Sequence, residues 1–207
     1  MPAPAPLETM QSIKGTQWGP SDGESSTING WLNFVGTSFP EMADYCNGET
    51  KIGYFSWCGC TVGYCIAKAG IRPVYTRGLD TKSFLWAQAW LDWGTPVTDP
   101  QAGDVLVFDF GHGDHHVTLF DHDNGNGTWA CLGGNQDHQV MVSNFRRSQC
   151  IGIRRHVQCL GDQPLQGLLV VDCVEANEPH TTGHRDRSGE FQSQAGLADP
   201  GRPDDGE

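Results

Sequence analysis

The chain of 207 residues is long enough for one domain with its own core, and short for two domains of ordinary size. Its formal net charge of −12 argues against nucleic acid or an anionic membrane as a partner, because those surfaces attract Lys and Arg. No apolar run approaches the length that spans a bilayer, so no membrane partner is expected.

The two ends of the chain differ in composition from its centre. Residues 1–26 are rich in Pro, Gly, Ser and Thr, while residues 158–207 are acidic and hold few large apolar side chains. Residues 157–207 carry ten Asp or Glu against three Arg, which is seven of the twelve net negative charges. We therefore predict a flexible N-terminal segment over 1–26, a folded domain over 27–157 and a mostly disordered acidic tail over 158–207.

Two helices are predicted in the first half of the folded domain. Apolar residues recur at helical spacing from Cys58 onward, and Gly70 follows as a left-handed stop, which predicts a helix of about three turns. A second helix is predicted over residues 81–93, with Asp80 or Thr81 as its cap.

The second half of the domain changes to short β-rich runs separated by turn residues. Strands are predicted over residues 104–110, 116–121, 128–132, 139–143 and 151–155. Connections this short cannot hold crossover helices, so the strands are expected to form an antiparallel meander. Helices followed by a meander predict an α+β architecture.

Cys58 is the strongest candidate for chemistry in this chain. A thiol in the first turn of a helix feels the positive end of the helix dipole and unpaired amide donors, which favour the thiolate that a nucleophile needs. The competing interpretation is a small buried core cysteine. That interpretation suits Cys60 and Cys65 better, because Cys65 points into the core and Cys60 is turned away from the Cys58 face.

His116 opens a strand, and a period of two places it on the same face as Phe120. A histidine on a strand that faces a helix N-terminus can take the thiol proton and return it to a leaving amine. His115, on the opposite face, is the alternative base. Asn135 falls at the end of the next strand, where its amide can orient the imidazole, although an Asn after two glycines also suits a plain turn.

These residues lie within six short segments that occur in the same order in bacterial and phage cell-wall hydrolases of the NlpC and CHAP type. CHAP stands for cysteine, histidine-dependent amidohydrolase/peptidase. The segments are Tyr54-Phe55-Ser56-Trp57-Cys58-Gly59-Cys60, Trp90-Leu91-Asp92-Trp93-Gly94, Gly103-Asp104-Val105-Leu106-Val107-Phe108, His116-Val117-Thr118-Leu119-Phe120, Leu132-Gly133-Gly134-Asn135-Gln136 and Ile151-Gly152-Ile153-Arg154-Arg155. The chain resembles this family over about residues 27–156.

The resemblance implies a papain-like α+β fold, with N-terminal helices packed on the antiparallel meander. It implies cleavage of a peptidoglycan stem-peptide amide through a thioester, by an amidase or an endopeptidase. Cys58 matches the nucleophile, His116 the base and Asn135 the orienting residue. No cofactor and no metal are expected with this chemistry.

The same resemblance implies an oxyanion donor at the backbone N–H of Cys58, with the Tyr54 hydroxyl as a candidate second donor. The chain departs from the family pattern in two places. Many CHAP proteins carry an acidic residue just before the Asn, where this chain has Gly134, and the family cysteine usually precedes Ala or Ser, where this chain has Gly59.

The first residues of the chain lack the positive charge and the apolar core of a secretory signal. A peptidoglycan hydrolase would then act in the periplasm or cell wall after delivery by a phage lysis programme or a contact-dependent secretion system. In the second case a dedicated immunity protein would be its partner.

Two other functions stay open from the sequence. Residues 112–123 hold four histidines and three carboxylates, a set that could bind zinc or calcium in a metal-dependent hydrolase. The eight cysteines also allow a disulfide-stapled binding module of the same fold, in which a bridged Cys58 could attack nothing.

Overall fold

A computed structural model describes residues 5–17, 22–47, 56–79 and 82–157 of the chain. The chain divides into two units, residues 1–158 and 159–207, and every described residue belongs to the first. The predicted disordered tail over 158–207 therefore lies outside the described residues. None of the helices within the described ranges combines the length and apolar character that a membrane crossing needs.

The described unit begins with helices and ends with strands. The helices are α1 (Pro6–Ser12), α2 (Asp22–Ser38), α3 (Ala43–Asn47) and α4 (Cys58–Lys68), with short 3-10 helices η1 (Pro40–Met42), η4 (Ala87–Asp92) and η5 (Arg147–Gln149). The strands are β1 (Thr95–Pro96), β2 (Val105–Asp109), β3 (His115–Asp123), β4 (Thr128–Gln136), β5 (Gln139–Arg146) and β6 (Cys150–Arg155).

All six strands belong to one antiparallel sheet in the order β1-β6-β2-β3-β4-β5. Strands β2 to β5 follow one another as the predicted meander. Strand β6 instead returns past the meander and pairs with β2 on the other side. Helices combined with an antiparallel sheet confirm the predicted α+β class.

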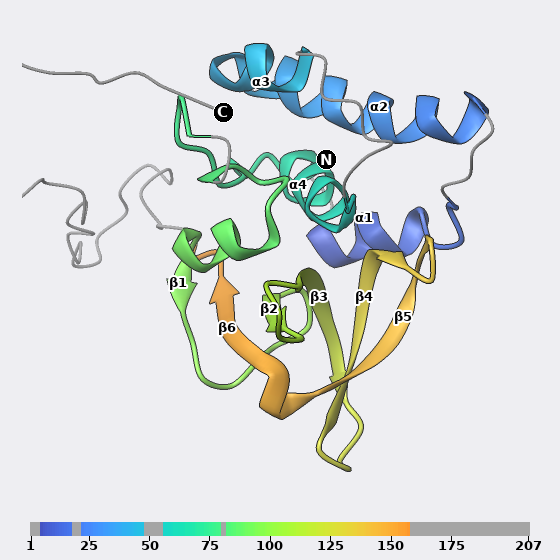
Figure 1. The fold of residues 1–207 in the computed structure, drawn as a ribbon, viewed down its shortest axis with the longest axis vertical. Helices are drawn as coiled ribbons and strands as arrows, with labels where there is room; N and C mark the ends of the chain where they lie inside the picture. The colour runs from blue at the N-terminus through green and yellow to red at the C-terminus, as the bar shows by residue number, and fades with distance from the viewer. Residues whose placement is uncertain (1–4, 18–21, 48–55, 80–81, 158–207) are drawn as a thin grey trace, which may run out of the picture. The chain divides into compact units, whose positions relative to one another are not determined.

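The helices gather on one side of the sheet, with α4 packed on β3 and β4 and α2 packed on α4 (Figure 1). Side chains of β3 alternate as the sequence predicts, because Val117 and Leu119 lie in the core shared with the helices, whereas Phe120 lies in a second apolar cluster on the opposite face. The sheet is therefore buried on both faces at β3.

The sheet curls strongly around the second cluster. Phe108 of β2 and Phe145 of β5 are three strands apart in the sheet order, with β3 and β4 between them, yet their ring centroids lie 4.7 Å apart. Rings on strands so far apart in a flat sheet could not touch, since neighbouring strands are about 4.8 Å apart. The chain passes from β5 through η5 into β6, which brings the end of β5 close to β2 (Figure 1).

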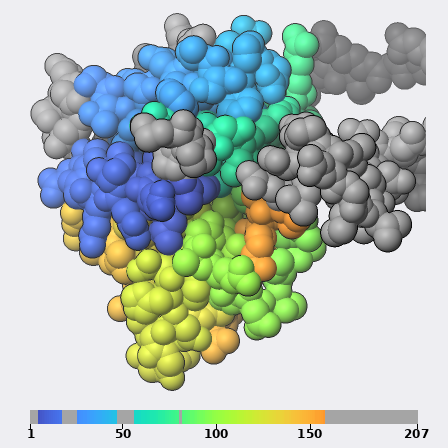
Figure 2. All heavy atoms as spheres, turned by 180° about the vertical axis from the view of Figure 1, so that it is seen from behind, coloured from blue at the N-terminus to red at the C-terminus, as the bar shows by residue number. Residues whose placement is uncertain are grey.

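The N-terminal segment differs from the prediction made for residues 1–26. Residues Pro6–Ser12 form α1, with Pro6 in its first turn, where the missing N–H costs no hydrogen bond. Met10 is fully buried, and α1 packs against α4 and β4. Seen from behind, α1 lies between the upper helices and the strands (Figure 2). The composition of this segment predicted flexibility because it contains few apolar residues. Those few are nevertheless enough to anchor the helix.

The predicted helix over residues 81–93 is wrong for its first half, and its predicted caps, Asp80 and Thr81, lie outside the described residues. The helical part of this segment is the 3-10 helix Ala87–Asp92, residues 83–86 before it are not helical, and Trp86 is extended. The carbonyl of Phe84, which an α-helix would use internally, accepts a bond from the Trp90 indole at 3.0 Å. Tertiary contacts of this segment therefore override its helical periodicity.

Candidate active site

Helix α4 begins at Cys58, where the sequence predicts it to start, and Gly70 follows its end with a φ of +74°. The first intrahelical bond runs from Thr61 N–H to the Trp57 carbonyl at 3.1 Å, and no side chain caps the helix. Amides of the first turn have no acceptor within a helix, so Cys58 lies where unpaired N–H groups and the dipole favour negative charge.

Gly59 lets this helix start approach the segment before η4. A Cβ at Gly59 would lie 2.6 Å from the Leu85 carbonyl oxygen and closer still to that of Phe84. Backbone oxygens cannot move aside as a flexible side chain can. The Gly59 departure from the family pattern is therefore a packing requirement that places Cys58.

A second glycine contact joins the helix start to the sheet. A Cβ at Gly134 of β4 would clash with the hydroxyl of Thr61 and lie 2.7 Å from the indole of Trp57. Only a residue without a side chain allows β4 to pass this close to the first turn of α4. The second departure from the family pattern, a Gly where an acidic residue is common, thus serves helix–sheet packing.

The structure brings the Cys58 thiol and the His116 imidazole together, close enough that each shifts the pKa of the other. Both are buried, with exposed fractions of 1 % for Cys58 and 8 % for His116. His115 is not part of this pair. Its ring contacts the Gly113 carbonyl at 3.1 Å and lies 4.0 Å from the Asp109 carboxylate.

The orienting contact comes from Gln136 rather than from the predicted Asn135. The Gln136 Oε1 atom lies 3.2 Å from His116 Nε2, while Asn135 is a half-buried bulge residue with a φ of +59°. The pairing of β4 with β5 shifts between Gly133 and Gln136, so the side-chain alternation slips by one residue. That slip turns the Gln136 side chain, and not that of Asn135, toward the imidazole.

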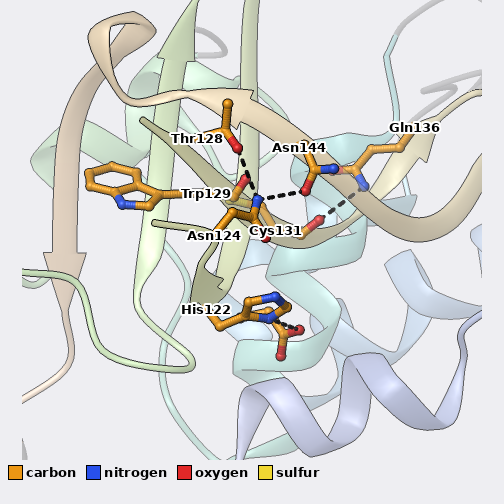
Figure 3. Close-up of polar contacts among 8 residues, drawn as sticks. His122, Asn124, Thr128, Trp129, Cys131, Gln136 and Asn144 are labelled. Atoms are coloured by element: carbon orange, nitrogen blue, oxygen red, sulfur yellow. Dashed lines mark hydrogen bonds and ion pairs between the residues drawn. The ribbon is translucent and has the colours of Figure 1, made fainter. Parts of the chain in front are cut away.

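The hydrogen bonds of Gln136 determine which tautomer His116 adopts. The Gln136 amide nitrogen donates to the Cys131 carbonyl at 3.3 Å (Figure 3) and also to the carbonyl of Met141. Since the NH₂ group is used, the oxygen Oε1 faces the ring and accepts from Nε2–H. An imidazole protonated at Nε2 keeps a lone pair on Nδ1. Nδ1 is therefore the nitrogen available to take the Cys58 proton.

Thr118 completes the support of Gln136. Its hydroxyl donates to the Leu132 carbonyl at 2.7 Å and lies 3.4 Å from Gln136 Oε1. Sequence reasoning missed Gln136, although a signal was present. The loop after β4 consists of Asp137 and His138, both with positive φ, as a two-residue hairpin turn requires. Such a turn makes Gln136 the last residue of its strand.

The electrostatics of the pair favour the charged forms of both partners. Burial by itself would raise the pKa of the Cys58 thiol, but the hydrogen bond and charge of His116, with the amides of Val117 and Gly59, lower it below its usual value. Burial would likewise lower the pKa of His116, and the interactions with Cys58 and Gln136, together with the charge of Asp114, raise it. The geometry therefore stabilises a thiolate–imidazolium pair.

The remaining cysteines of the described part have inert surroundings. Cys46, Cys58, Cys60, Cys65, Cys131 and Cys150 are free, so no bridge blocks Cys58. Desolvation raises the pKa of Cys60 far above its usual value and that of Cys46 to about 11. The disulfide-stapled alternative requires a bridged Cys58, and the structure has a free one.

The second alternative, a metal site in residues 112–123, has no converging ligands. Within the described residues, no group of three or more His, Cys, Asp or Glu side chains is arranged to hold an ion. His122 pairs with Asp121 at 3.0 Å (Figure 3), and Asp123 accepts from the Gly125 amide at 2.9 Å. Asp123 thus serves the turn of the β3–β4 hairpin, while Asp121 pairs with its neighbour.

No family model matches the chain, and neither a curated protein nor a solved structure matches it. The functional assignment therefore depends on the geometry of this site and on the order of the sequence segments.

A test of Gln136 against Asn135 follows from the observed contact. Gln136→Ala removes the acceptor of His116 Nε2–H, and losing a hydrogen bond to a charged group costs about 1.5–3 kcal/mol. We expect a fall in kcat/KM of roughly 10- to 100-fold. The control, Asn135→Gly, keeps the left-handed backbone and should stay within about two-fold of wild type. Equal losses in both variants would place the orienting group elsewhere.

The pH dependence follows from the directions of the two shifts. The thiolate forms as pH rises through the Cys58 pKa, which is lowered, and the imidazolium is lost as pH rises through the His116 pKa, which is raised. Both directions widen the window near neutral pH in which the ion pair exists. Alkylation rates and kcat/KM against pH measure it. In His116→Ala the acid limb of alkylation should move to higher pH, and an unmoved limb would contradict the pairing.

Proposed function

We propose that this protein is a cysteine amidohydrolase or peptidase that cleaves an amide bond of the peptidoglycan stem peptide. The observation that supports this proposal most strongly is the series of interactions from Cys58, at the start of a helix, through His116 to the Gln136 amide. A thiol, an imidazole and an amide held in this order can run nucleophilic acyl transfer.

The steps use groups present at this site. The Cys58 thiolate attacks the carbonyl carbon and forms a tetrahedral intermediate, whose oxyanion can accept from the Cys58 N–H at the start of α4. The His116 imidazolium gives its Nδ1 proton to the leaving amine as the C–N bond breaks, which leaves a thioester. Neutral His116 then takes a proton from water, and the hydroxide attacks the thioester carbonyl, so that the C–S bond breaks, the acid is released and the thiolate–imidazolium pair is restored. The Tyr54 hydroxyl, the candidate second donor, lies outside the described residues.

Peptidoglycan as the substrate, and a papain-like fold, are supported by the six ordered segments. Helix α4 carries the candidate nucleophile and packs on the sheet whose strand β3 carries the candidate base. That division of roles between a helix and an antiparallel sheet is what the papain-like fold implies. The departures at Gly59 and Gly134 have packing reasons in this chain and leave the thiol and imidazole in contact.

Substrate access requires a local movement. Cys58 is 1 % exposed, so a substrate carbonyl reaches its sulfur only when neighbouring atoms move aside. Exclusion of water from the resting pair has a chemical benefit, because electrostatic interactions are stronger in a medium of low dielectric.

Digestion of purified sacculi tests the proposal. Sacculi are incubated with the wild-type protein or with Cys58→Ala, and the soluble fragments are identified by mass. We expect fragments with one newly hydrolysed amide from the wild type alone, and their masses distinguish a sugar–peptide amide from a bond within the stem peptide or crossbridge. Fragments released equally by both proteins, or by neither across peptidoglycans of different stem chemistry, would refute the assignment.

A further inference from the structure

Two phenylalanine rings lie against the imidazole of His116. The ring centroid of Phe145 is 5.4 Å from that of His116 at an interplanar angle of 36°, and Phe110 is 6.4 Å away at 25°. The two phenylalanine rings also stack on each other, with centroids 5.9 Å apart. The imidazole thus has an aromatic surface on one side, in addition to its thiol and amide contacts.

The curl of the sheet creates this contact. Phe145 lies near the end of β5, where it pairs with Trp129 of β4. Trp129 in turn pairs with Asp123, which lies at the opposite end of β3 from His116. The ring reaches His116 only because the chain turns through η5 into β6, whose Cys150 pairs with Phe108, and Phe108 pairs with His116. The contact between Phe145 and His116 therefore depends on the curling of the sheet, because β5 and β3 are not neighbouring strands.

Aromatic rings near an imidazolium act on its charge. A ring face attracts a cation within about 6 Å of its centroid, and the attraction grows when water is excluded. Phe145 is inside that distance and Phe110 just beyond it. Since His116 is 8 % exposed, little water competes for its charge.

We propose that Phe145, assisted by Phe110, is a positioning residue that holds the His116 ring and stabilises its protonated form. The role in catalysis rests on the proposed function, whereas the effect on the imidazole does not. Phe110, at 38 % exposure, is the more exposed ring of this aromatic pair, since Phe145 is half-buried.

Titration of His116 by NMR tests the proposal without any substrate. The full chain carries Cys58→Ala, so that the thiolate no longer affects the imidazole, and the His116 ring signals are followed against pH. Phe145→Leu in this background should lower the midpoint by about half a unit to one unit, because a cation–π contact of about 1 kcal/mol corresponds to most of a unit. Phe110→Leu, at a half-exposed site, should lower it by less.

Phe120→Leu is the matched control, since Phe120 lies on the same face of β3 but packs edge-on to Trp129 at 5.8 Å. Its midpoint should match the parent. Phe145→Tyr keeps the ring and should also match the parent. Unchanged midpoints in both Phe145→Leu and Phe110→Leu, or an equal shift in Phe120→Leu, would overturn the proposal. If Phe145→Leu does not fold, Phe110→Leu against Phe120→Leu decides by the same criterion.

The pH dependence of kcat/KM tests the role of Phe145 in catalysis, and the NMR midpoints test its effect on His116 independently of the proposed function. With Cys58 restored, Phe145→Leu should move the alkaline limb of kcat/KM to lower pH by a similar amount. A wild-type protein inactive on sacculi would remove the proposed function, and the NMR midpoints would still support or overturn the role of the rings.

Discussion

Cys58→Ala is expected to reduce amide hydrolysis by about 10⁴-fold or more, because no other group at the site can form the acyl intermediate. The variant should fold normally. Removing one sulfur atom from a helix start leaves a small gap, and alanine is a strong helix former. Initial rates of fragment release from sacculi, with circular dichroism as the folding check, measure the effect.

Cys60→Ala is the matched control for this loss. Cys60 is buried in the same helix only two residues away, and its pKa is raised strongly by desolvation and by the neighbouring cysteines Cys46, Cys65 and Cys58, whereas that of Cys58 is lowered. We expect Cys60→Ala to retain activity and Cys58 to be the site that iodoacetamide modifies at neutral pH. Modification of Cys60 in preference to Cys58 would contradict the ion-pair arrangement.

Gly59→Ala is expected to lower activity by roughly 100-fold, because displacing a catalytic group by about 1 Å has effects of that size. The new methyl group meets the carbonyl oxygens of Phe84 and Leu85, so the start of α4 must shift. Overpacking of this kind also destabilises a fold by about 1–3 kcal/mol. The kcat/KM value and the urea midpoint are measured together.

Two further glycine variants separate stability from geometry. Gly63→Ala meets the Phe84 ring one turn further along α4, so it should destabilise the fold with a smaller loss of activity. Gly30→Ala on α2 meets nothing within 4 Å and should raise stability by up to about 1 kcal/mol through helix propensity. If Gly63→Ala lost as much activity as Gly59→Ala at equal stability, the prediction that the close packing at Gly59 places Cys58 would be wrong.

The contrast between Asn135 and Gln136 shows where sequence periodicity fails. Strand alternation places a side chain correctly only while the register continues, as it does from His116 to Phe120. At the end of β4 the register shifts, and two adjacent amides exchange faces. The prediction of an amide side chain beside the imidazole was correct in type, but the amide belongs to Gln136 and not to Asn135.

The helix predicted over residues 81–93 is wrong before η4 for a different reason. Its apolar spacing suits a helix, yet the carbonyls of Phe84 and Leu85 lie against Gly59 and that of Phe84 accepts from Trp90. Those partners come from α4 and from a side chain six residues away. Local pattern carries no information about such contacts, so it predicted a regular helix where tertiary bonds hold an irregular turn.

The amino-acid order alone determined the α+β class, the β2–β5 part of the meander and the start of α4 at Cys58, because hydrophobic period, turn residues and short connections are local properties of a chain, whereas the place of β6 beside β2 was not predicted. Tertiary structure alone decided that Gln136 holds the imidazole, that Phe145 reaches it from β5 and that glycine must follow Cys58. Each of those outcomes depends on the close approach of segments distant in sequence, and a bulge or a curled sheet sets that approach through packing.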